Sequence, residues 1–105
     1  MRLKTTFAVL LLGGLTATSV LAQDAARLHQ RALAATCANC HGTDGRTVQG
    51  SAVPALAGMP KDYMIQQMKA FQNGTRPATV MHQLAKGLTD EQIESAAAYF
   101  STLKR

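Results

Sequence analysis

Aromatic side chains are scarce in this chain. Of its 105 residues, three are Phe, two are Tyr and none is Trp. With so few aromatic groups among the basic residues, a nucleic-acid-binding surface has little support. Alternating strand patterns, internal repeats and low-complexity tracts are also missing, whereas apolar residues recur at three- and four-residue spacing. This spacing predicts a small all-α domain.

Long apolar runs are absent except for one interrupted stretch at the N-terminus. Residues 1–4 include two basic side chains, and residues 7–15 are mostly apolar. Residues 20–22 end on a small side chain at the position that a signal peptidase recognises. This order is typical of a signal peptide comprising residues 1–22. An uncleaved membrane anchor is the alternative, but the stretch falls short of about 20 strongly apolar residues. We therefore predict one exported, periplasmic domain over residues 23–105, with no membrane insertion after cleavage.

The predicted mature domain is small and weakly basic. Removing residues 1–22 leaves 83 residues. A domain of this size buries only about 60% of its unfolded surface, so a large apolar cofactor would form much of its core. The full chain has a formal net charge of +5, from 11 basic and 6 acidic residues. Because cleavage after Ala22 removes Arg2 and Lys4, the formal charge falls to +3.

Cysteine occurs only twice, and both residues belong to one pentapeptide. Residues 37–41 read C-A-N-C-H, the C-x-x-C-H pattern for covalent attachment of a c-type haem. Because Cys37 and Cys40 lie about one helical turn apart, both thiols can form thioether bonds to the vinyl groups of one porphyrin. His41 is then held against the iron, where its imidazole can serve as an axial ligand.

Two other kinds of site use a C-x-x-C pair. Thioredoxin-like redox sites have this spacing, but they are expected within a βαβ unit, and no strand pattern surrounds the motif. A zinc site needs four ligands. Beyond Cys37, Cys40 and His41, the chain offers only the distant His29 or His82, which lack paired spacing.

Three helices are expected in the mature domain. The first starts near Ala25 and leads into the cysteines. The second covers residues 60–73, from a proline to the residue before a glycine. The third begins after Thr89, an N-cap that forms a capping box with Gln92. The apolar residues expected to face the core are Ala25, Leu28, Ala32 and Ala35 in the first helix, Met64, Met68 and Phe71 in the second, and Ile93, Ala96, Ala97, Phe100 and Leu103 in the third.

The first and last of these helices are expected to pack together. Small side chains at Ala96 and Ala97 permit a close approach to Ala32 and Ala35 of the first helix. The long irregular segment over residues 42–60 contains several glycines and prolines and few charges. Because a loop of this length in a small domain usually has a function, we expect it to cover one face of the haem.

These features together resemble the class I c-type cytochromes, in particular the small bacterial domains of dihaem electron carriers and of the cytochrome subunit of flavocytochrome c sulfide dehydrogenase. The resemblance covers nearly all of residues 25–104, and its most specific element is the C-x-x-C-H motif in an exported chain. It implies a small cytochrome c fold, with the N- and C-terminal helices packed together and loops wrapped around a covalent haem. The matching segments are residues 37–42, 54–58, 63–71, 80–82, 88–93 and 98–100.

The resemblance also implies a set of haem contacts. A methionine that follows the loop over residues 75–79 would be the distal ligand. Met59 is the rival for that position, although the family usually has a polar residue there. The implied contact residues for one covalent haem c are Cys37 and Cys40 (thioethers), His41 (proximal ligand), Met81 (distal ligand) and Pro54, whose carbonyl would accept the second ring N–H of His41.

An iron that carries an imidazole and a thioether has no open position for a substrate, so the site would shuttle single electrons. The resemblance therefore implies electron transfer between redox protein partners. The chain would be either the haem subunit that accepts electrons from a sulfide-oxidising flavoprotein or a freely diffusing carrier to a terminal oxidase or another reductase. A peroxidase-like haem enzyme and a thiol oxidoreductase are the competing classes. Candidates for the docking surface around the exposed haem edge are Arg46, Arg76 and Lys86.

Overall fold

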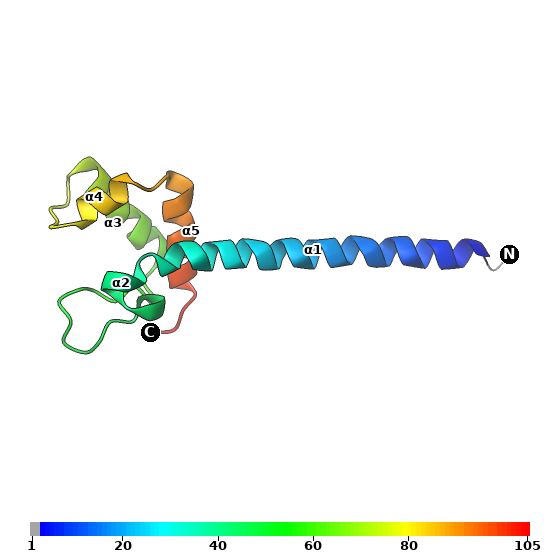
Figure 1. The fold of residues 1–105 in the computed structure, drawn as a ribbon. Helices are drawn as coiled ribbons and strands as arrows, with labels where there is room; N and C mark the ends of the chain where they lie inside the picture. Colours follow the sequence, from blue (N-terminus) through cyan, green and yellow to red (C-terminus); the bar gives the residue numbers. More distant parts are fainter. Residues whose placement is uncertain (1–2) are drawn as a thin grey trace.

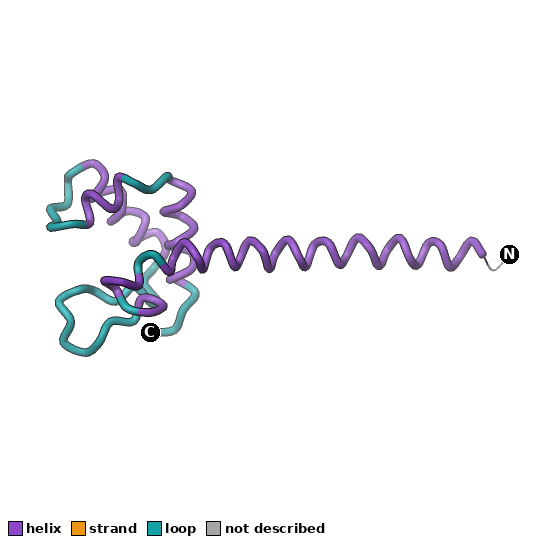
Figure 2. The backbone as a smooth tube through the Cα atoms, viewed as in Figure 1, coloured by secondary structure: helices purple, strands orange, loops and turns teal. Residues whose placement is uncertain are grey.

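The computed structural model describes the backbone of residues 3–105 and the side chains of residues 19–105. Within this part of the chain every regular element is helical and no strand occurs (Figure 1, Figure 2), which confirms the predicted all-α class. The elements are α1 (Leu3–Ala35), α2 (Ala38–His41), the 3-10 turn η1 (Thr43–Gly45), α3 (Lys61–Asn73), α4 (Met81–Lys86) and α5 (Asp90–Ser101).

α1 is much longer than the first helix expected from the sequence. Its C-terminal part packs against α5, whereas its N-terminal part projects away from the other helices (Figure 1). Among the described helices, none combines the length and the apolar character that crossing a membrane requires. The expected signal peptide comprises residues 1–22, and the side chains of residues 1–18 lie outside the described part. The signal peptide and its cleavage therefore stay predictions.

The core is a small apolar cluster where α1, α3 and α5 meet. It consists of Ala34 from α1, Met64 from α3, and Ala97 and Phe100 from α5. Ala97 and Phe100 are 0% and 1% exposed. The small side chains of Ala34 and Ala97 permit a close approach of α1 and α5. The expected packing of the first and last helices is thus confirmed.

The face of α1 that meets α5 differs from the predicted one. Ala34 is only 2% exposed and Leu33 is half-buried. Cys37, three residues after Ala34, also packs against the core. The prediction was wrong because alanines contrast little with their neighbours, so more than one face of a helix can satisfy the same period. The residues predicted to face the core are exposed: Ala25, Leu28, Ala32 and Ala35.

α3 and α5 begin and end close to the predicted residues. Pro60 is the N-cap of α3, and Gly74 follows its end in the left-handed conformation at φ 79°. At the start of α5, the Thr89 side chain accepts a hydrogen bond from the Gln92 backbone N–H at 3.2 Å, and the Gln92 side chain accepts one from the Thr89 N–H at 2.9 Å. The predicted capping box is therefore complete.

α4 was not predicted. It has six residues, and its N-cap, Val80, makes no side-chain hydrogen bond to the helix. A helix this short shows too few turns for a 3.6-residue pattern and is not stable alone. Its existence depends on contacts with α3, against which it packs.

The capping box yields a prediction about stability. Thr89→Ala removes the acceptor for the Gln92 N–H, so the free energy of unfolding should fall by about 1 kcal/mol. Urea titration should show a lower midpoint with an unchanged slope. The control is Thr79→Ala, at an exposed threonine in the loop before α4. Equal effects of the two substitutions would contradict the role of the cap.

Candidate functional site

The C-x-x-C-H motif forms a single tight turn directly after α1. Thr36 closes the end of α1 by donating from its hydroxyl to the Leu33 carbonyl at 2.7 Å. Cys37 then occupies the N-cap of α2, and its carbonyl accepts from the His41 N–H at 3.0 Å. The turn includes Cys40, so both thiols and the imidazole belong to one helical turn, as the spacing predicts.

The two thiols are not joined to each other. Cys37 is half-buried and Cys40 is exposed, and neither forms a disulfide. Burial raises the pKa of the Cys37 thiol, and a hydrogen bond with Thr36 opposes this shift only in part. Reactive cysteines of thiol oxidoreductases have a lowered pKa, because the thiolate is the nucleophile. The environment of Cys37 therefore disfavours the thiol-oxidoreductase interpretation.

His41 is the single buried polar or charged residue of the described core, at 8% exposure. Its Nδ1 atom lies 2.7 Å from the Pro54 carbonyl oxygen. Because a carbonyl only accepts hydrogen bonds, Nδ1 must carry the proton of the neutral ring. The lone pair then resides on Nε2, which is the arrangement that metal-bound histidines adopt.

The loop between η1 and α3 is fixed to the core on both sides of Pro54. The Gly45 carbonyl accepts hydrogen bonds from the Leu56 and Ala57 N–H groups at 2.8 and 3.2 Å. Gly45 itself has a φ of 69°, and a Cβ there would lie 2.8 Å from the Leu56 Cβ. Only glycine fits this position, because it combines a positive φ with close packing. These hydrogen bonds close the loop between residues 45 and 56, and Pro54 within it meets His41.

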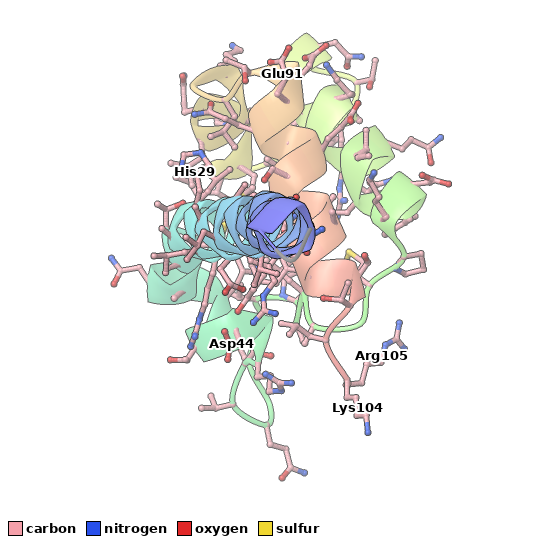
Figure 3. The ribbon with its side chains drawn as sticks, turned by 90° about the vertical axis from the view of Figure 1, so that its right-hand side faces the viewer. His29, Asp44, Glu91, Lys104 and Arg105 are labelled. Carbon is pink, nitrogen blue, oxygen red and sulfur yellow. The ribbon has the colours of Figure 1, made fainter. Side chains whose placement is uncertain are left out.

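A polar cluster that the sequence did not predict ties this loop to α5. The Tyr99 hydroxyl donates to Asp44 Oδ1 at 2.6 Å, and this hydrogen bond raises the pKa of Tyr99. Arg46 Nη1 lies 3.7 Å from Asp44 Oδ2, and Arg46 Nη2 donates to the Lys104 carbonyl at 2.9 Å. Asp44 accordingly lies at the same end of the domain as Lys104 and Arg105, away from Glu91 (Figure 3). No local pattern could reveal a contact between residues 55 positions apart.

The two candidate distal methionines have different surroundings. Met59 is partly buried and packs against the core cluster. Met81 is half-buried and is the first residue of α4, directly after the loop that precedes it. Of the two, Met59 is the one whose side chain already has an apolar packing role.

The cations expected around the haem edge also differ from one another. Arg76 is half-buried, lies 4.6 Å above the Phe71 ring and donates to Gln67 Oε1 at 2.5 Å. Its charge is engaged within the domain. Arg46 and Lys86 are exposed. Lys86 lies in α4, the helix that begins with Met81.

The side chains after the motif suit a large apolar cofactor. Several large apolar side chains after the motif are exposed, and a porphyrin offers apolar surface that could cover them. The Nδ1 atom of His82 is buried without a hydrogen-bond partner in the protein. Within the described residues, no three His, Cys, Asp or Glu side chains gather as a metal-binding group. The exposed apolar residues after the motif are Val48, Tyr63, Val80 and Leu84, at 48% to 80% exposure.

Comparisons with known proteins agree with this geometry. The family model for cytochrome c matches residues 29–104. A cytochrome c-552 of Acidithiobacillus ferridurans is 48% identical over 68 residues, which cover 64% of this chain and 28% of that protein. The cytochrome subunit of sulfide dehydrogenase of Chlorobaculum tepidum is 41% identical over 73 residues, which cover 70% of this chain and 64% of that subunit.

A solved structure of cytochrome c4 from Acidithiobacillus ferrooxidans shares the fold. It superimposes with a TM-score of 0.59 at 46% identity, covering 64% of this chain and 38% of that one. This chain thus spans less than two thirds of the length of each of these three proteins. Because the family model matches well over half of the chain and the C-x-x-C-H turn lies within the match, the chain belongs to the cytochrome c family, as a class I c-type cytochrome with covalently bound haem c.

Proposed function

We propose that the chain is an exported, periplasmic one-electron carrier, with one haem c attached at Cys37 and Cys40 and ligated by His41 and Met81. The observation that carries the proposal is the 2.7 Å contact between His41 Nδ1 and the Pro54 carbonyl within the C-x-x-C-H turn. The haem iron would supply a one-electron couple. The protein would supply attachment, ligands and a dry apolar surrounding.

Pro54 and His41 would act as a unit on the proximal side. The hydrogen bond holds the ring at a fixed angle and leaves Nε2 as the ligating atom. It also increases the electron density on the imidazole, as hydrogen-bonded partners of metal ligands do. His41 itself is buried at 8% exposure, and the hydrogen bond to Pro54 is partly buried.

Met81 is the better distal ligand of the two methionines. The loop that contains Met59 is bound to Gly45 and Phe100 through backbone hydrogen bonds, and it already supplies Pro54 to the proximal side. Met81 comes from a separate helix and has no place in the core cluster. A thioether ligand favours the ferrous state and raises the reduction potential. With both axial positions filled, direct peroxide chemistry is disfavoured.

Two kinds of redox partner fit a carrier of this family. Similarity to a sulfide dehydrogenase cytochrome subunit supports a role as the electron acceptor of a sulfide-oxidising flavoprotein. The chain is also similar to a cytochrome c-552 and a cytochrome c4, whose names do not mention a dehydrogenase. The alternative role is a freely diffusing carrier that passes electrons to a terminal oxidase or another reductase.

Covalent attachment can be tested directly. Protein produced with a haem-attachment system should keep its haem through acidified-solvent extraction, because thioether bonds do not depend on the iron ligands. Mass spectrometry should show one haem adduct on the peptide that contains Cys37 and Cys40. Free thiols, or bound zinc without haem, would contradict the assignment.

The distal ligand can be tested by replacing each methionine. Met81→Ala should abolish the weak sulfur-to-iron absorption at the red edge of the ferric spectrum. It should also lower the reduction potential by on the order of 0.1 V. Axial ligands set the reduction potentials of haem proteins over a range of roughly 0.8 V. Met59→Ala should change neither property and should mainly lower stability, because Met59 packs on the core. The opposite pattern would assign the ligand to Met59.

The partner can be tested by salt dependence and co-purification. A permanent haem subunit should co-purify with a flavin-containing protein at high salt, because a largely apolar interface is not screened. A free carrier should separate, and its reaction with acidic partners should slow as salt rises. Lys86→Gln should weaken that dependence, because Lys86 is exposed and lies in α4, the helix that begins with Met81. A monomer with strongly salt-dependent kinetics would exclude the subunit role.

A further inference from the structure

α4 needs support from outside itself. It spans only Met81–Lys86, and its N-cap Val80 makes no side-chain hydrogen bond to it. The terminal N–H and C=O groups of any helix lack partners within that helix, and in six residues nearly all such groups are terminal. A free α4 would therefore fray. Because Met81 is its first residue, fraying would move the Met81 sulfur.

Gln72 of α3 supplies a second partner at the C-terminal end of α4, where the Ala85 carbonyl also accepts from the Leu88 backbone N–H at 3.1 Å. Its half-buried side chain donates both N–H groups of the amide, one to the Ala85 carbonyl at 2.8 Å and one to the Leu88 carbonyl at 3.0 Å. Ala85 is 0% exposed, so water does not reach its surroundings. The amide of Gln72 thus joins the end of α4 to the turn that leads into α5.

No other side chain of α3 makes a hydrogen bond to α4 in the described part of the chain. Lys69, one turn earlier, pairs with Asp90 of α5. Gln67 bonds to Arg76, which follows α3 itself. Among the described residues, Gln72 is therefore the side chain of α3 that forms a polar link to α4.

We propose that Gln72 is a positioning residue for the distal ligand: by holding the C-terminal end of α4, it fixes Met81 at the other end. The inference rests on the proposed ligation by Met81. A six-residue helix is only about 9 Å long, so loosening of its last turn also loosens its first residue. Gln72 would thereby favour the iron–sulfur bond over ligands from solution, although it does not itself touch the iron.

Gln72→Glu in the haem-loaded protein tests the proposal. The carboxylate has nearly the same shape but cannot donate to either carbonyl. Loss of two hydrogen bonds, one of them to the carbonyl of the fully buried Ala85, should tighten binding of free imidazole to the ferric iron about tenfold or more, because imidazole competes with Met81. Hydrogen exchange of the α4 backbone amides should speed up as well. The matched control is Gln67→Ala, which removes a hydrogen bond of the same helix that does not reach α4.

A double-substitution cycle separates positioning from general destabilisation. In a Met81→Ala background, Gln72→Glu should not tighten imidazole binding further. The inference is overturned if Gln72→Glu tightens imidazole binding equally in the Met81→Ala background. It is also overturned if Gln67→Ala tightens imidazole binding as much as Gln72→Glu does, because Gln72 would then have only a structural role. If the Gln72→Glu variant does not fold, Gln72→Asn replaces it, because the shorter amide cannot reach both carbonyls. Gln72→Asn should tighten imidazole binding to a smaller extent. Unchanged imidazole binding in this variant would overturn the inference.

If Met81 is not the ligand, Met81→Ala alone leaves imidazole binding and the red-edge absorption unchanged. That result would refute ligation of the iron by Met81 before any variant of Gln72 is measured. Failure of the ligand assignment and failure of the positioning role are thus distinguishable.

Discussion

The arrangement of the C-x-x-C-H turn and the loop that follows it depends on one contact, the hydrogen bond between His41 Nδ1 and the Pro54 carbonyl. It requires a tautomer with the proton on Nδ1, so it determines which ring nitrogen can ligate a metal. It also requires the loop to return to the motif 13 residues later. Gly45 makes this return possible through its positive φ and its close packing on the core.

A small core supports this arrangement. Ala34 and Ala97 bring α1 and α5 close together, so the end of α1 and the C-x-x-C-H turn are held against α5. Tyr99 of the same helix α5 holds Asp44 of η1. The proximal side is thus anchored by packing and hydrogen bonds to α5. The proposed distal side depends on a short helix that Gln72 holds from α3.

Much of the fold could be predicted from local patterns. The capping box at Thr89 and the glycine that ends α3 involve residues a few positions apart, and both lie where the patterns indicated. The C-x-x-C-H motif likewise indicated a single turn with both thiols and the imidazole. By contrast, the buried face of α1 was predicted incorrectly, because its alanines provide little contrast. α4 was missed, because six residues are too few for a periodic signal.

The sequence by itself determined the helical class, the attachment motif and the helix ends, because each depends on chemistry within one or two turns of chain. Only the tertiary structure decided which face of α1 is buried, that Tyr99 reaches Asp44, and that Gln72 supports α4. These contacts join residues 13 to 63 positions apart. A hydrogen bond at that separation exists only after packing has brought its donor and acceptor together, and no local propensity encodes it.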